Sequence, residues 1–182
     1  MMPPTDALTS LLTFHRSIRV ALQVFASTAG LASAGLFDVI RVSALSDFFC
    51  GPLRWHDEDE ALSLLPRLLD VDPERARGPI AACALEHARV AQAIDGVLDH
   101  LQALTDGSVA PDAELLATVN HELQTVFTAH LLREEQEIFP LARAVLNNEA
   151  LRQMGLEMHA RRLLRLQGPM RATALSPNPR QP

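Results

Sequence analysis

Apolar residues recur every three or four positions along most of the chain, whereas alternating apolar and polar positions are rare. This spacing is typical of α-helices that bury one face, and Ala, Leu, Arg and Glu dominate the periodic blocks. The pattern predicts helices over about 6–25, 36–69, 79–104, 112–146 and 149–166. We therefore expect an all-α protein, built as an antiparallel up-down-up-down four-helix bundle with a short fifth helix at the C-terminus.

Local signals mark where these helices begin and where they are interrupted. Thr5 or Asp6 is suited to cap the first helix, because a short oxygen-bearing side chain can accept hydrogen bonds from the free N–H groups of a helix N-terminus. Gly51 and Pro52 predict a bend or a restart within the second helix, since proline removes a helical hydrogen bond.

Length and composition limit the class of protein. The 182 residues suit a single domain, which we place at 1–166, and the proline-rich remainder at 167–182 has no periodicity and is expected to form a disordered tail. A net charge of −6 provides no basic surface for a nucleic acid. No apolar run reaches the roughly 20 residues of a membrane span, and the start of the chain lacks the features of a secretory signal. We therefore expect a cytoplasmic protein without a nucleic-acid or membrane partner.

The two cysteines suggest neither a disulfide framework nor a thiolate zinc site. Cys50 and Cys83 lie in different predicted helices and form no C-x-x-C motif. Free cysteines are among the residues most often buried in proteins. The expectation for both is a reduced, buried thiol.

A motif of the form H-x3-E-x5-P occurs twice, each time with two apolar residues just before the proline. Its positions are His56, Glu60 and Pro66 in the first copy and His130, Glu134 and Pro140 in the second. Each copy follows a further histidine, His15 at 41 residues before His56 and His87 at 43 residues before His130. The chain thus consists of two similar halves, and we expect each proline to kink or end its helix.

The spacing within the motif indicates metal binding. Residues i and i+4 lie on one face of a helix, so the imidazole and carboxylate of each H-x3-E pair can converge on ions in a bundle core. A single histidine on an apolar face is more often a core residue. Six positions that repeat in register favour a metal site instead, with nitrogen and oxygen donors that suit iron, manganese or zinc. Two carboxylates shared between the halves suit a dinuclear site.

These residues resemble the hemerythrin-like, or HHE cation-binding, domains over about residues 8–162. The resemblance rests on four segments besides His15: His56 with Glu60 and the following L-L-P, Glu86 with His87, His130 with Glu134, Glu135 and the following I-F-P, and the closing E-M-x-A-R-R at 157–162. It implies a four-helix bundle around a non-haem di-iron centre with an oxo or hydroxo bridge, in which zinc or manganese could replace iron. The ligands that it implies are His15, His56, Glu60, His87, His130 and Glu134.

The resemblance also implies a function, namely a bacterial protein that binds or senses O2, NO or iron. The chain differs from the oxygen-carrying hemerythrins at Ala91, where they have a second histidine, and at Glu134, where they have an aspartate one residue later. These differences argue against reversible oxygen carriage. One alternative is a di-iron enzyme that acts on peroxide or dioxygen, and another is a bundle with zinc or no metal that works by protein interaction. The sequence leaves open whether the chain forms a homodimer.

Other residues near the motif have less defined roles. His159 could reach the open end of the bundle, whereas His100 and His121 are expected to be solvated. Glu58 or Glu135 could accept a hydrogen bond from a ligand imidazole. The aromatic residues beside the ligands are expected to pack the core and shield the site from water; they are Phe14, Trp55, Phe127 and Phe139.

Overall fold

A computed structural model gives the structure of residues 6–34, 36, 38–110 and 112–173. Within these ranges the regular secondary structure is entirely helical, which confirms the all-α prediction. The α-helices are α1 (Ala7–Ser33), α2 (Val39–Phe48), α3 (Arg54–Asp59), α4 (Leu65–Val71), α5 (Pro73–Thr105), α6 (Ala113–Arg133), α7 (Phe139–Val145) and α8 (Asn148–Thr173). Three π-helical segments connect some of them, namely η1 (Phe49–Leu53), η2 (Glu60–Leu64) and η3 (Glu134–Ile138).

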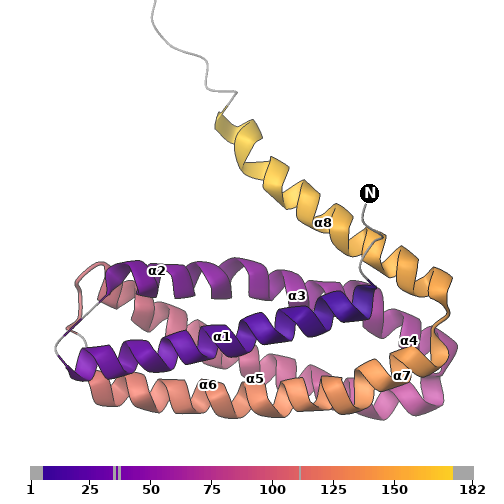
Figure 1. Cartoon of the computed structure of the whole chain (residues 1–182), viewed down its shortest axis with the longest axis horizontal. Helices are drawn as coiled ribbons and strands as arrows, with labels where there is room; N and C mark the ends of the chain where they lie inside the picture. Colours follow the sequence, from indigo (N-terminus) through magenta and orange to yellow (C-terminus); the bar gives the residue numbers. More distant parts are fainter. Residues whose placement is uncertain (1–5, 35, 37, 111, 174–182) are drawn as a thin grey trace, which may run out of the picture.

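Four rods of helix lie side by side along the molecule (Figure 1). The first rod is α1, the second runs from α2 through η1, α3 and η2 to α4, the third is α5, and the fourth runs from α6 through η3 to α7. Helices α1 and α5 each contact both α2 and α6, so the four rods enclose a common interior. Helix α8 leaves this group obliquely at one end (Figure 1).

Aspartates at the helix N-termini account for where the rods begin. Asp6 occupies the N-cap position of α1, as predicted, but its carboxylate accepts a hydrogen bond from Thr9 Oγ1 and none from the backbone; Thr5 lies outside the described residues. The Asp72 carboxylate accepts a hydrogen bond from the backbone N–H of Arg75, and the Asp112 carboxylate accepts two from the first turn of α6. The cap at Asp72 explains why α5 begins earlier than the periodicity alone predicted.

The π-helical segments show how the two motif prolines are accommodated. Pro66 lies just after η2 and Pro140 just after η3, and neither has an N–H to continue the α-helical hydrogen bonds. The backbone N–H of Leu65 instead bonds the carbonyl of Glu60, five residues earlier, and that of Phe139 bonds Glu134 in the same way. Each rod therefore continues through its proline with one wide turn and does not end there.

Other boundaries also differ from the sequence-based prediction. Pro52 lies inside η1, so the helix continues across Gly51 and Pro52 where a restart was one expectation. Helix α1 extends to Ser33, beyond the predicted end near residue 25. Helix α8 has 26 residues and is not short. Residues 174–182 of the predicted tail lie outside the described residues, and the domain boundary at 166 stays a prediction.

Two apolar clusters fill the interior, one toward each end of the rods. The first apolar cluster includes Ile18, Phe25, Leu53, Val90 and Phe127. The second apolar cluster includes Leu8, Leu11, Leu64, Ile138 and Phe139. Along the first three rods, a short stretch that contains the predicted ligands separates the residues of the two clusters; along the fourth, Glu134 lies between them and His130 lies beside Leu131 of the first cluster. The fold thus positions a polar layer between two apolar ones.

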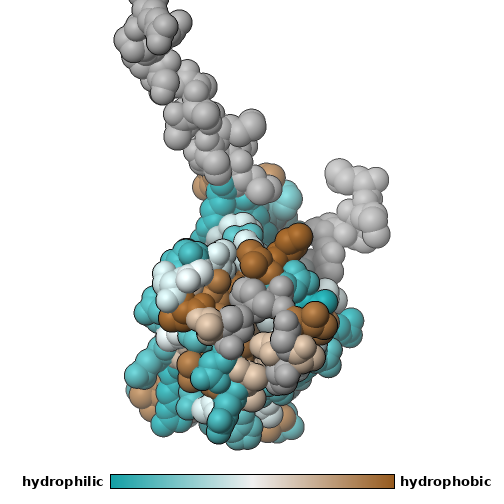
Figure 2. All heavy atoms as spheres, turned by 90° about the vertical axis from the view of Figure 1, so that its left-hand side faces the viewer, coloured by the Kyte–Doolittle hydropathy of each residue, from teal (hydrophilic) through white to brown (hydrophobic). Residues whose placement is uncertain are grey.

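The surface mixes polar and apolar side chains. Figure 2 shows the end of the molecule at which α2 begins, where brown apolar residues interrupt a mostly teal surface. Leu36, Val39 and Ile40 are exposed in the segment that begins α2. None of the helices in the described part of the chain combines the length and the hydrophobicity that a membrane span requires. The cytoplasmic location stays a prediction.

Candidate metal centre

The polar layer brings all six predicted ligand residues together in the interior. His15 comes from α1, His87 from α5 and His130 from α6, while His56 lies on α3 and the two glutamates begin η2 and η3. Five of the six side chains are at most 2% exposed, and that of His87 is 20% exposed. Side chains from the two ends of the motif set, such as His15 and Glu134, thus share one buried site.

The i,i+4 pairs meet as their spacing predicts. His56 Nε2 lies 3.4 Å from Glu60 Oε1, and His130 Nε2 lies 3.3 Å from Glu134 Oε1. In both pairs the histidine stands on an α-helix and the glutamate is the first residue of the following π-helical segment. The wide turn therefore begins at the ligand position in both halves, a placement that π-helical segments often have in proteins.

Each glutamate contacts imidazoles from both halves of the chain. Glu134 Oε2 lies 3.1 Å from His15 Nε2, while its Oε1 lies 3.4 Å from His87 Nε2. Glu60 Oε1 faces His56, and its Oε2 lies 3.4 Å from His87 Nε2. Each carboxylate thus directs its two oxygens toward imidazoles of different halves of the chain.

The buried donor atoms of this layer fit a bound cation. Buried polar atoms in proteins almost always have a hydrogen-bond partner. Here six nitrogen and carboxylate oxygen atoms that face one another have no hydrogen-bond partner, namely His15 Nε2, His56 Nε2, His87 Nε2, Glu60 Oε1 and Oε2, and Glu134 Oε2. Nδ1 of His56 and of His130 is also buried without a partner. Such a cluster of unpaired donors is expected where metal ions complete the interactions.

The electrostatics of the metal-free site are consistent with this fit. Burial lowers the pKa of His56 and of His130 to about 4, so both are neutral, as metal ligands must be. Burial also lowers the pKa of His87, but Glu134 and Glu60 outweigh it and raise that pKa to about 10. Burial raises the pKa of Glu134, and the imidazoles of His15 and His87 reverse this and lower it to about 2. The proton on His87 therefore balances part of the negative charge of Glu60 and Glu134. A bound cation would displace this proton and balance that charge instead.

A further carboxylate orients His15. The Nδ1–H of His15 donates to Glu135 Oε1 at 2.8 Å, and Arg19 Nη2 donates to the same oxygen at 2.9 Å. A carboxylate on the outer nitrogen of a histidine holds the ring so that Nε2 faces the ion. The predicted hydrogen bond to Glu135 is confirmed. The equivalent expectation for Glu58 is wrong, because Glu58 pairs with Arg165 of α8.

Helix α8 fixes the segment that contains Glu60. The neighbouring Asp59 is fully buried and accepts hydrogen bonds from Arg161 Nη2 at 2.8 Å and Arg162 Nη2 at 2.9 Å. Glu157 of α8 accepts a further bond from Ser63 Oγ of η2 at 2.8 Å. The closing E-M-x-A-R-R residues thus position the first H-x3-E motif from outside the four rods.

Two residues near the site were not predicted as part of it. Cys83 is fully buried, and its Sγ donates to Glu134 Oε1 at 3.4 Å. Burial raises the pKa of Asp57, which follows His56, to about 7. The signal for Cys83 was its place one helical turn before His87. The companion expectation for Cys50 is wrong, since that thiol is exposed.

The remaining histidines lie outside this layer. His121 and His159 are exposed and His100 is half-buried. Within the described chain, the groups of side chains that could hold an ion contain none of these three histidines. His159, for which the sequence left a site role open, therefore does not reach the site. The expectation of a solvated His100 is wrong in part, because its Nε2 atom is buried.

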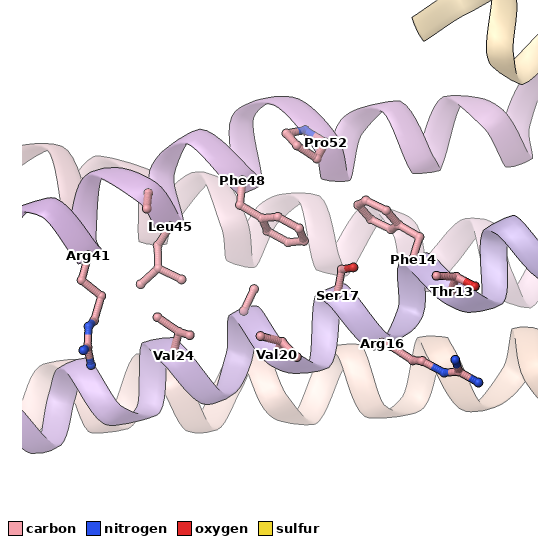
Figure 3. Close-up of a pocket in the computed structure, with 12 residues that line it drawn as sticks. Thr13, Phe14, Arg16, Ser17, Val20, Val24, Arg41, Leu45, Phe48 and Pro52 are labelled. Atoms are coloured by element: carbon pink, nitrogen blue, oxygen red, sulfur yellow. The ribbon is translucent and has the colours of Figure 1, made fainter.

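An apolar groove approaches the site from the surface between α1 and α2 (Figure 3). Its volume is about 660 Å3, and its lining includes Val20, Val24 and Leu45. Phe14 and Phe48 also line it and stack on each other with ring centroids 5.7 Å apart. Phe14 in turn stacks on His56 at 4.7 Å, so one ring separates the groove from a site imidazole.

Comparison with known proteins adds a family match. The family described as hemerythrin HHE cation binding domain matches residues 6–142. This range includes all four rods up to α7 and every predicted ligand residue. Among curated proteins, none matches the chain.

Proposed function

The chain belongs to the hemerythrin HHE cation-binding domain family, and we propose that it binds a pair of iron ions within an antiparallel up-down-up-down four-helix bundle. The proposed ligands are His15, His56, Glu60, His87, His130 and Glu134. The family match supports cation binding, and the two groups of clustered donors in the described residues support a dinuclear site.

One observation carries the proposal, namely that each glutamate faces both halves of the site. Glu134 Oε2 lies 3.1 Å from His15 Nε2, while Oε1 lies 3.3 Å from His130 Nε2. If a glutamate only balanced the charge of one buried imidazole, it would be enough for one of its oxygens to lie near that ring. Both oxygens of both glutamates are instead directed to different rings, an arrangement that favours two ions over one.

The donor set supports iron. Imidazole and carboxylate ligands suit iron, manganese and zinc, and a site built from six such ligands around two ions is typical of non-haem iron proteins. A pair of iron ions, when bound, supplies the redox change and the coordination of a small ligand. The chain's own contribution is to keep His56 and His130 neutral, to hold the His15 ring with Glu135, and to exclude water between two apolar layers.

We propose that O2 or NO binds at this centre and that binding, or iron loading itself, is the signal that the protein senses. The apolar groove beside α1 and α2 supports an uncharged ligand, because small apolar molecules partition into such surfaces. Phe14 lies between the groove and His56 and would admit a diatomic molecule more easily than a larger one.

The test is metal analysis of protein expressed in iron-replete medium. We expect about two iron ions per chain and near-ultraviolet absorption from an oxo-to-iron transition. The double variant Glu60→Ala, Glu134→Ala should lose most of the iron, whereas the matched variant Glu114→Ala, Glu122→Ala, which removes two exposed carboxylates from α6, should retain it. Fewer than one iron ion per chain without this absorption contradicts the proposal.

A second candidate function is a di-iron enzyme that acts on peroxide or dioxygen. The 20% exposure of His87 supports it, because a polar substrate such as peroxide could enter beside this ring. Iron-loaded protein should then consume peroxide faster than the Glu60→Ala, Glu134→Ala variant. Equal rates would exclude the enzyme and leave the binding function in place.

A further inference from the structure

A thiol lies among the proposed ligands of one half of the site. Cys83 is fully buried on α5, one turn before His87, and its Sγ lies 3.4 Å from Glu134 Oε1. Cys83, His87, His130 and Glu134 each place a donor atom within 4.8 Å of those of the other three. Four donors at such separations can reach a single ion, since metal–ligand bonds of about 2.0–2.3 Å place the donors within this range of one another.

Ordinary packing does not account for the position of this thiol. Free buried cysteines usually pack as small hydrophobic residues. Among the described residues, Cys83 belongs to neither apolar cluster and lies in the polar layer between them. The surroundings of Cys83 are therefore those of a ligand.

A second observation points to a cation on this side of the layer. Glu60 is 1% exposed, and neither of its carboxylate oxygens has a hydrogen-bond partner. Its Oε2 is directed toward His87 Nε2, 3.4 Å away. A buried carboxylate is costly unless it is paired, and an ion bound beside His87 would satisfy this oxygen.

We propose that Cys83 is a metal ligand, so that the position beside His87 and His130 binds its ion through a thiolate, two imidazoles and the Glu134 carboxylate. The position beside His15 and His56 then uses only nitrogen and oxygen donors, which makes the two positions chemically unequal. On metal binding the S–H bond breaks, sulfur bonds to the ion and the proton passes to water. This inference rests on the proposed function, since it adds a donor to the same site.

A softer ligand changes the preference for metal ions. Thiolates favour zinc and cobalt over manganese, whereas carboxylates and imidazoles discriminate less. The position beside Cys83 should therefore take up Zn2+ or Co2+ before the other position does. A mixed site, with different ions in the two positions, becomes accessible when both metals are available.

The test is a titration of the metal-free full chain with Co2+, which reports sulfur ligation through a thiolate-to-cobalt charge-transfer band in the near ultraviolet. Wild-type protein should show this band, and Cys83→Ser should lose it together with at least about 10-fold in affinity for the first ion. Cys50→Ser is the matched control, because Cys50 is exposed and is the only other cysteine of the sequence. This control should retain both the band and the affinity.

The outcomes separate this inference from the function on which it rests. Two bound cobalt ions without a thiolate band, or a band that survives in Cys83→Ser, would overturn the role of Cys83 alone. Wild-type protein that binds no cobalt or iron would overturn the proposed function as well. Should Cys83→Ser fail to fold, X-ray absorption at the zinc edge of wild-type protein decides the question, because a sulfur neighbour is expected and a shell of only nitrogen and oxygen contradicts it.

Discussion

His15 and His87 occupy equivalent positions in the two halves of the chain, yet their surroundings differ. His15 is fully buried, and its Nδ1–H donates to Glu135, which also binds Arg19. His87 is 20% exposed, and Ala61 stands at the position of the first motif that Glu135 occupies in the second. The His15 imidazole thus donates a hydrogen bond to an ion-paired carboxylate, whereas the His87 imidazole borders solvent.

The residues one turn away from these histidines differ as well. Cys83 precedes His87 by four residues, where the buried Leu11 precedes His15. Ala91 follows His87 by four residues, where Arg19 follows His15. The duplicated motif therefore explains the shared geometry of the site residues, and the residues around it differ in polarity and exposure between the two proposed metal positions.

The largest expected effect concerns the ion pairs between α8 and Asp59 of the first motif. Among the described residues, α8 forms no such pair with the second motif. Replacing both Arg161 and Arg162 with Gln leaves the Asp59 carboxylate buried without its cationic partners, and such a loss costs about 3–5 kcal/mol. Urea unfolding should show a decrease of this size in the free energy of unfolding.

The control for this prediction is an exposed ion pair on the same helix. Arg152→Gln removes the partner of Glu149, and both side chains are more than half exposed. We expect a change below about 0.5 kcal/mol, as for most surface pairs. Equal effects of the two changes would show that α8 does not hold η2 through Asp59.

The second prediction concerns His56 and His130, which occupy equivalent positions in the two halves and are both buried. Burial lowers the pKa of both to about 4, against 6.5 for the unfolded chain, so below pH 6.5 the unfolded state binds more protons. Between pH 6.5 and 5 the two histidines together should destabilise the metal-free protein by about 3 kcal/mol, and Asp57, with a pKa raised to about 7, should offset roughly half of this loss. Thermal unfolding in the presence of a chelator measures this change.

Variants of these histidines sharpen the comparison between the halves. His56→Gln and His130→Gln should each reduce the loss of stability between pH 6.5 and 5 by about 1.5 kcal/mol, because each takes away one buried imidazole. His121→Gln, an exposed change on α6, should leave the pH dependence intact. Unequal effects of the first two variants would show that the two halves are not equivalent in this respect.

The smallest expected effect tests the difference between His15 and His87 directly. Glu135→Gln removes the carboxylate behind His15 and should weaken metal binding about 10-fold, as the loss of such partners typically does. Ala61→Glu places a carboxylate at the equivalent position of the first motif and should strengthen binding. Competition with a chelator measures both affinities, and no change in either would contradict the role assigned to Glu135.

The helical fold and the association of the six site residues could be predicted from the sequence, because both depend on local spacing. His56 with Glu60, and His130 with Glu134, must share a helix face whenever the segment is helical, and the repeat extends this to all four rods. The role of Cys83 could not be predicted in this way. The place of Cys83 one helical turn before His87 puts it on the same face of α5, but its nearness to Glu134 depends on how α5 packs against α6.

The π-helical segments and the role of α8 also escaped prediction, for a physical reason. Pro66 and Pro140 are compatible with the end of a helix, a kink or a wide turn, since each alternative satisfies the missing N–H differently. Only the bonds from Leu65 to Glu60 and from Phe139 to Glu134 distinguish these cases. Likewise, the sequence alone assigns no role to Arg161 and Arg162, because their hydrogen bonds to the buried Asp59 depend on where α8 lies.

The polar layer between the two apolar clusters has a consequence for cooperativity. Each cluster draws residues from several rods, so each end of the molecule has a core of its own. The ligands between them contribute little hydrophobic burial, and without a cation they combine unpaired donors with a proton on His87. Bound ions would join four rods at mid-length, so their removal should loosen the coupling between the ends and broaden the unfolding transition. A bound metal would then couple the two small cores, so that they unfold in a single cooperative transition.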